Sequence, residues 1–63
     1  MKREIAIFTM YDKEIKIYYD DRKEKYSSSY DNYITSELEY LENHLVDICL
    51  ELDCPFYYMT MFL

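Results

Sequence analysis

The feature that most constrains this chain is a single apolar stripe at helical spacing between residues 38 and 52. The stripe consists of Leu38, Leu41, Leu45, Ile48 and Leu52, with Cys49 beside them. Recurrence at three- and four-residue intervals places such side chains along one side of an α-helix. Ser36 with Glu39 three residues later is a capping-box pattern, so we expect the helix to begin near Thr35 or Ser36. It should end before Pro55.

Three other segments have the composition of β-strands. Residues 4–11 and 14–20 are rich in β-branched and aromatic side chains and are separated only by Asp12 and Lys13, which predicts a hairpin without the usual glycine. Residues 56–63, after the helix, are apolar or aromatic at nearly every position and predict a third strand. The polar, Ser-rich stretch 21–34 has no sustained period, and we expect a loop there.

The expected fold is therefore one α+β domain over residues 1–63 with the order ββαβ. A right-handed crossover through the helix places the last strand beside the first, which gives a three-stranded, antiparallel-dominated sheet in the order 2-1-3. The helix packs on one face of this sheet and leaves the other face without cover. We therefore expect a homodimer whose interface lies on the last strand. Its expected residues are Tyr57, Met59, Met61 and Leu63.

Several kinds of chemistry are disfavoured by the residues present. The chain has no glycine, and the loops that cradle phosphates need glycine where backbone approaches the ligand. Cys49 and Cys54 are too few to staple a secreted mini-protein, so we expect two reduced thiols. The only imidazole, His44, points about 140° away from Cys49 on a helix, which argues against a metal site. We expect no enzyme, no catalytic residue, no metal and no cofactor.

Charge is divided unevenly along the chain. All seven Lys and Arg lie at or before Lys25 together with six acids, whereas seven acids and no cation follow, so the two parts carry +1 and −7. The helical carboxylates consequently have no cation at i,i+3 or i,i+4. Direct binding to nucleic acid is disfavoured, because the chain as a whole, at −6, repels phosphate.

Two expected binding surfaces follow from this pattern. On a helical wheel, apolar residues fall among unpaired carboxylates, an arrangement in which apolar contact supplies affinity and charge supplies steering. The residues of this surface are Glu37, Glu39, Glu42, Asn43, Val46, Asp47, Leu50 and Glu51. In the loop, Tyr26, Tyr30 and Tyr33 alternate with Ser and Asn, a composition typical of binding loops. Packing of these rings over the open sheet is an equal alternative.

In its length and in the acidic residues from Glu37 to Asp53, the chain resembles the small acidic proteins that phages encode to disable host machinery. That class includes anti-CRISPR proteins, uracil-DNA glycosylase inhibitors and other DNA mimics. The resemblance implies an inhibitor whose carboxylates replace nucleic-acid phosphates in the basic groove of a host protein, such as a CRISPR nuclease complex. With no apolar run of roughly 18 residues and no signal-peptide core, we expect a cytoplasmic protein without a membrane anchor, in the host cell if phage-encoded.

Two alternatives remain open from the sequence. One is a small homo-oligomeric structural subunit that assembles through its exposed sheet, and the other is an antitoxin-like partner that neutralises a basic toxin. Charge reversal in the helix should damage an inhibitor, whereas a charge at Met59 or Met61 should damage an oligomer.

Overall fold

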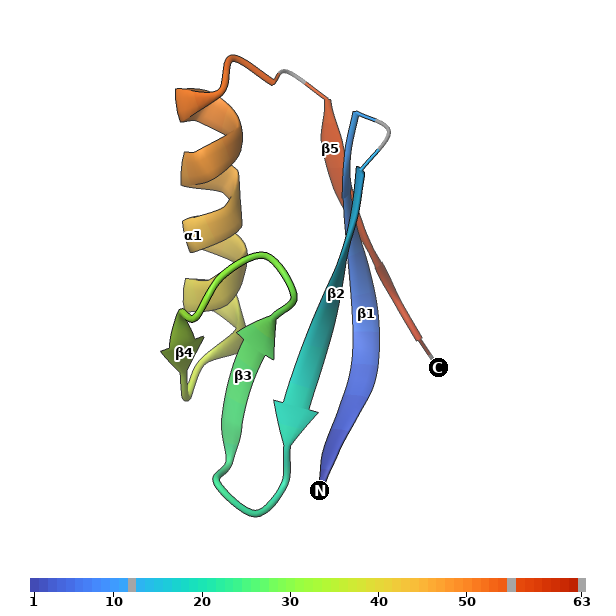
Figure 1. The fold of residues 1–63 in the computed structure, drawn as a ribbon, viewed down its shortest axis with the longest axis vertical. Helices are drawn as coiled ribbons and strands as arrows, with labels where there is room; N and C mark the ends of the chain where they lie inside the picture. The colour runs from blue at the N-terminus through green and yellow to red at the C-terminus, as the bar shows by residue number, and fades with distance from the viewer. Residues whose placement is uncertain (12, 55, 63) are drawn as a thin grey trace.

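The computed structural model describes residues 1–11, 13–54 and 56–62 and consists of one helix on one sheet (Figure 1). The strands are β1 (Lys2–Met10), β2 (Lys13–Asp20), β3 (Lys25–Ser28), β4 (Ile34–Thr35) and β5 (Tyr57–Met61), and the helix is α1 (Leu38–Glu51). The sheet order is β4-β3-β2-β1-β5, and every pairing is antiparallel. The α+β class and the single helix agree with the sequence.

The prediction of three strands is wrong, because the sheet formed by the described residues has five. β3 lies within residues 21–34, which were expected to form a loop, and β4 begins at the last of these residues and includes Thr35, where the helix was expected to begin. β3 extends the sheet beyond β2, with Tyr26 opposite Tyr19 and their rings 4.8 Å apart. Because β3 is polar, its composition did not predict a strand. Its pairing with β2, a strand rich in tyrosine, stabilises it.

The core lies between α1 and the inner face of the sheet. The fully buried large side chains are Phe8, Ile15, Ile17, Leu41, Leu45 and Cys49. A β-bulge at Ile5, between Glu4 and Ala6, shifts the register so that Ala6 lies opposite Ile17. From there to Met10, alternate β1 side chains face the helix, which explains the alternating burial of β1.

The helix ends differ from the expected capping pattern. Ser36 does not cap α1, because the N-cap position is Glu37, whose side chain makes no cap hydrogen bond. At the other end the Cys54 N–H donates to the Cys49 carbonyl (2.8 Å) and the Asp53 N–H to the Leu50 carbonyl (3.2 Å), which is a Schellman motif. Asp53 takes the left-handed conformation (φ 55°) that glycine usually supplies there.

The stripe of helical leucines is shorter than expected. Leu41, Leu45 and Cys49 are buried, and Leu38 and Ile48 are partly buried against them. Leu52 is 58% exposed, so its predicted place in the core is wrong. It lies at the C-cap, where the chain leaves the helix.

Candidate functional site

The outer face of α1 presents an acidic ridge. Glu39, Asn43, Asp47 and Glu51 recur at four-residue intervals and are all exposed. Residues at this spacing line up along one side of a helix, about 6 Å apart along its axis. Burial of Leu41, Leu45 and Cys49 on the opposite side turns this ridge towards solvent. Glu37, just before the helix, is also exposed, whereas Glu42 is partly buried at the flank.

No described Lys or Arg side chain neutralises this ridge. The ion pairs found within residues 1–11, 13–54 and 56–62 join Lys16 to Glu4, the terminal ammonium to Asp20 and Asp21, and His44 to Asp31. None of them includes a carboxylate of α1, and the last turn of the helix contains no basic residue. The ridge therefore presents uncompensated negative charge to a partner.

Apolar side chains flank the acidic ridge. Leu50 is 68% exposed, and Val46, one turn earlier, is partly buried. Tyr40 is 57% exposed and was not singled out in the sequence. The sequence could have indicated it, because Tyr40 lies three residues before Asn43 and seven before Asp47. Both intervals place side chains on the same side of a helix. The acidic ridge and these flanking residues form the candidate interface.

The three tyrosines of the predicted binding loop do not share a surface. Tyr26 belongs to β3 and packs against the core. The Tyr33 ring stacks on the His44 ring with centroids 4.1 Å apart, and His44 Nε2 lies 2.7 Å from Asp31 Oδ2. Tyr30 is 38% exposed, and Lys13 Nζ lies 6.0 Å from its ring centroid. Tyr26 and Tyr33 thus pack against other residues of the protein. The three rings do not form one surface.

The residues expected at an oligomer interface lie on β5, at one edge of the sheet. Tyr57 and Met61 are 40% and 47% exposed, and Met59 is partly buried against the core. They pair with Met10, Ala6 and Phe8, so their side chains share the face that bears the helix. Leu63 lies outside the described residues.

The thiols are buried and free. Cys49 Sγ lies 3.2 Å from Met10 Sδ, and Cys54 Sγ donates to the Phe56 carbonyl at 3.2 Å. Burial raises the pKa of the Cys49 thiol, which disfavours the reactive thiolate. In the described part of the chain, no cluster of three His, Cys, Asp or Glu side chains is arranged to hold a metal ion.

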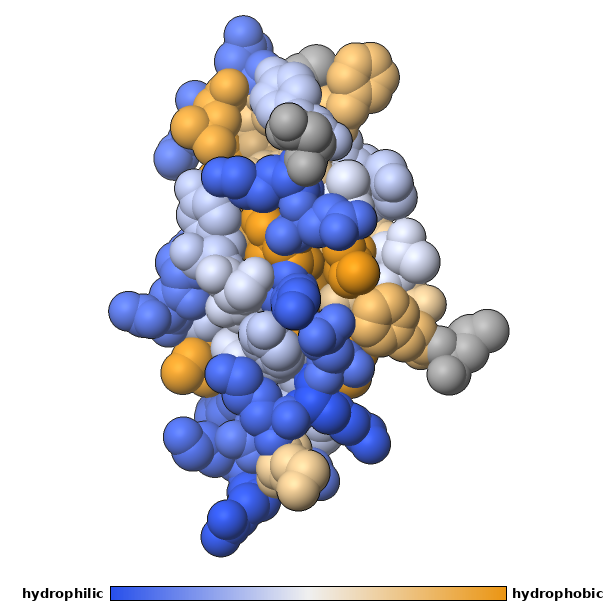
Figure 2. Space-filling view, turned by 45° about the vertical axis from the view of Figure 1, so that its right-hand side comes forward, coloured by the Kyte–Doolittle hydropathy of each residue, from blue (hydrophilic) through white to orange (hydrophobic). Residues whose placement is uncertain are grey.

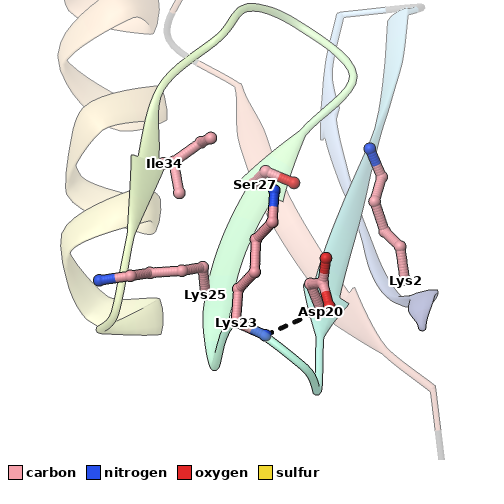
Figure 3. Close-up of a pocket in the computed structure, with 6 residues that line it drawn as sticks. All are labelled: Lys2, Asp20, Lys23, Lys25, Ser27 and Ile34. Atoms are coloured by element: carbon pink, nitrogen blue, oxygen red, sulfur yellow. Dashed lines mark hydrogen bonds between the residues drawn. The ribbon is translucent and has the colours of Figure 1, made fainter.

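A small hollow lies on the sheet face opposite the helix (Figure 3). It measures about 90 Å³ and is lined by Lys2, Asp20, Lys23, Lys25, Ser27 and Ile34. Small-molecule sites enclose roughly 300 to 1,000 Å³, so this hollow is too small for a substrate pocket. Its one carboxylate already has hydrogen-bond partners, because Asp20 Oδ1 accepts hydrogen bonds from the backbone N–H groups of Arg22 (3.0 Å) and Lys23 (3.4 Å). These hydrogen bonds, that from Arg22 foremost, lower the pKa of Asp20.

Comparison with protein-family models, with curated proteins and with solved structures finds no match for this chain. No helix among the described residues is long and apolar enough to cross a bilayer.

Proposed function

We propose that this protein is a small acidic binding protein that inhibits a nucleic-acid-processing protein by covering its basic surface with the outer face of α1. The observation that carries the proposal is the acidic ridge, whose carboxylates have no Lys or Arg ion pair in the described structure. An exposed acid at the C-terminal end of a helix costs roughly 0.3 to 1 kcal/mol, so Glu51 lowers the stability of the free protein. A cationic partner would remove that cost.

The spacing of the ridge suits a groove that binds phosphates. Glu39, Asp47 and Glu51 lie about 12 and 6 Å apart along the helix axis. Arg and Lys side chains that bind phosphates donate the same charge-assisted hydrogen bonds to carboxylates. Leu50 and Tyr40 beside the ridge add the apolar contact that phosphates lack, and this contact gives the protein an affinity beyond electrostatic mimicry.

The test compares two double variants with the same change in net charge. Asp47→Lys with Glu51→Lys reverses the ridge, whereas Glu14→Lys with Glu24→Lys reverses two exposed acids on β2 and the β2–β3 turn. Basic nucleic-acid-binding proteins are isolated from a bacterial lysate on heparin and loaded with fluorescent duplex DNA. Release of the DNA on addition of each protein is then followed by anisotropy.

The wild-type protein should release the DNA, the helix variant should need at least about tenfold more protein, and the sheet variant should match the wild type. Release that weakens equally in both variants would mean that net charge alone acts, and the ridge would lose its role. A wild-type protein that releases no DNA would contradict the proposal directly.

A second candidate function is that of a structural subunit that assembles through its sheet. The observation that favours it is the composition of the chain from residue 55 to the end, which contains no charged residue although 32% of the whole chain is charged. β5 lies in this stretch and at a sheet edge. Charge introduced on β5 should abolish assembly and leave DNA release unchanged.

A further inference from the structure

The outer edge of β5 is identified by the hydrogen bonds of its inner edge. The Phe62 N–H donates to the Ile5 carbonyl at 2.9 Å, and the Tyr11 N–H donates to the Phe56 carbonyl at 3.4 Å. In an antiparallel pair, residues that bond to the neighbour alternate with residues that do not. Tyr58 and Thr60 therefore bond towards β1, and the backbone groups of residues 57, 59 and 61 point away from the sheet.

This edge lacks the features that normally prevent strand pairing. Natural edge strands are shortened, charged or covered, because their unpaired N–H and C=O groups template pairing with another chain. The opposite edge, β4, is only two residues long. β5 is five residues long, carries no charge and, among the residues that the structure describes, has a neighbouring strand on one side only. It is the edge at which another strand can add.

Both faces of this edge are apolar and exposed. On the helix-bearing face, the Tyr57 ring stacks on Phe8 with centroids 5.9 Å apart and remains 40% exposed. On the other face, Tyr58 is 62% exposed, and Phe62, just beyond the strand, is 45% exposed. Figure 2 shows apolar colour on its right-hand side, whereas the lower part of the view is mostly hydrophilic.

We propose that β5 pairs antiparallel with β5 of a second copy, about a two-fold axis that passes between the two Met59 residues. In this register Met59 lies opposite Met59 of the partner, and Tyr57 lies opposite the partner's Met61. All three residues turn their free backbone groups outward, so the pairing forms about six backbone hydrogen bonds. It also brings each Tyr57 ring beside a methionine sulfur, a favourable contact. The product is one continuous sheet with both helices on the same face.

The self-complementary register of residues 57, 59 and 61 makes a second copy the expected occupant, and charge does not prevent it. Each copy has a net charge of −6, which opposes association in general. The strand itself is neutral, however, and α1 packs on β1, β3 and β4 but lies inside the β5 edge. The two helices are then at least three strand spacings apart, about 14 Å, which exceeds the Debye length of about 8 Å at physiological salt. The inference identifies the partner in the second candidate function, and the acidic-ridge proposal does not depend on it.

The first experiment measures mass by sedimentation equilibrium up to millimolar concentration. The wild-type protein should reach twice its mass of 7.8 kDa. Met59→Pro should remain a monomer, because proline removes the outward N–H at the centre of the interface. The fold should survive, since an edge strand tolerates proline where its N–H faces solvent. Urea unfolding of the variant checks this, and release of DNA from a target with one basic site by Met59→Pro should equal that by the wild type.

A second experiment tests the register through disulfide formation. Met59→Cys places two thiols opposite each other at a Cα separation of about 5.5 Å, within the range of a disulfide. Oxidised glutathione should convert this variant to a covalent dimer by two thiol–disulfide exchanges that release reduced glutathione. Thr60→Cys is the matched control, because its side chain lies on the other face and two residues out of register with its counterpart. It should stay monomeric.

Three results would overturn the inference: a wild-type protein that stays monomeric at millimolar concentration, a dimer that persists in folded Met59→Pro, or equal cross-linking of both cysteine variants. The native thiols do not confuse the second experiment, because Cys49 and Cys54 are 0% and 2% exposed.

Discussion

Reversal of one charge at the end of α1 should stabilise the protein while it weakens binding. Glu51 is exposed, ends the helix and follows Asp47 by one turn. Glu51→Lys replaces an acid that the helix dipole disfavours with a cation that it favours, each worth about 0.3 to 1 kcal/mol. It also creates an Asp47–Lys pair at i,i+4, worth about 0.2 to 0.5 kcal/mol. The free energy of unfolding should rise by about 1 to 2 kcal/mol in total.

The assay is urea unfolding followed by circular dichroism of the helix, at low salt and in 1 M NaCl. A domain of this size gains roughly 4 to 8 °C in Tm per kcal/mol, so thermal unfolding should show a rise of at least about 4 °C. The gain should shrink in 1 M NaCl, because the Debye length falls to about 3 Å. DNA release should weaken in the same variant.

Glu39→Lys is the matched control at the other end of the ridge. Glu39 is the acid of the first turn, where the helix dipole favours negative charge. The same substitution there should lower stability by roughly 0.3 to 1 kcal/mol and weaken DNA release as well. A Glu51→Lys protein that is no more stable than the wild type, or whose gain is unchanged in 1 M NaCl, would refute the reasoning that this carboxylate is uncompensated.

Three further predictions concern the fold. Leu45→Ala, at a side chain that is 1% exposed, should cost about 2 to 5 kcal/mol in urea unfolding, whereas Leu50→Ala, at 68% exposure, should change stability by less than about 0.5 kcal/mol. Asp53→Gly should stabilise by about 1 kcal/mol, because glycine adopts φ 55° without strain, and Asp47→Gly inside the helix should cost about as much. Because hydrogen bonds lower the pKa of Asp20 below 3.8 in the folded state, its contribution to stability is present above pH 4 and is lost as the pH falls through the folded pKa. Urea unfolding of Asp20→Asn should lose less stability on acidification than the wild type, and equal losses would contradict this.

Much of the fold was accessible from local patterns in the sequence. The alternation of apolar and polar side chains in residues 14–20 and the apolar run after Pro55 both predict strands. In the structure both strands pair with β1. The helix was accessible because Leu41, Leu45 and Cys49 recur at its period. In each of these elements the same residues determine both the local conformation and the packing, so the sequence pattern was sufficient.

The elements that the sequence did not indicate depend on contacts between distant segments. β3 forms because Tyr26 meets Tyr19 on β2, and no feature of residues 25–28 alone indicates this pairing. The capping box failed because Thr35 belongs to β4, which keeps the chain extended until Glu37. The Glu37 N–H then donates to Thr35 Oγ1 at 3.3 Å, and this hydrogen bond forms where a capping box was expected. Tertiary pairing thus overrode local preference at both places.

The acidic ridge and the β5 edge lie on different elements, and the ridge is on the solvent side of α1, opposite the residues that pack on the sheet. One molecule can therefore use both surfaces at once. A dimer formed through β5 would present two acidic ridges on the same side of one sheet, so that a target with two basic sites at matching distance would be bound twice. Because the second contact is then intramolecular, avidity exceeds the affinity of a single ridge, by a factor of about 100 or more when the geometry fits. Met59→Pro should then leave binding to a target with one basic site unchanged and reduce binding to a target with two.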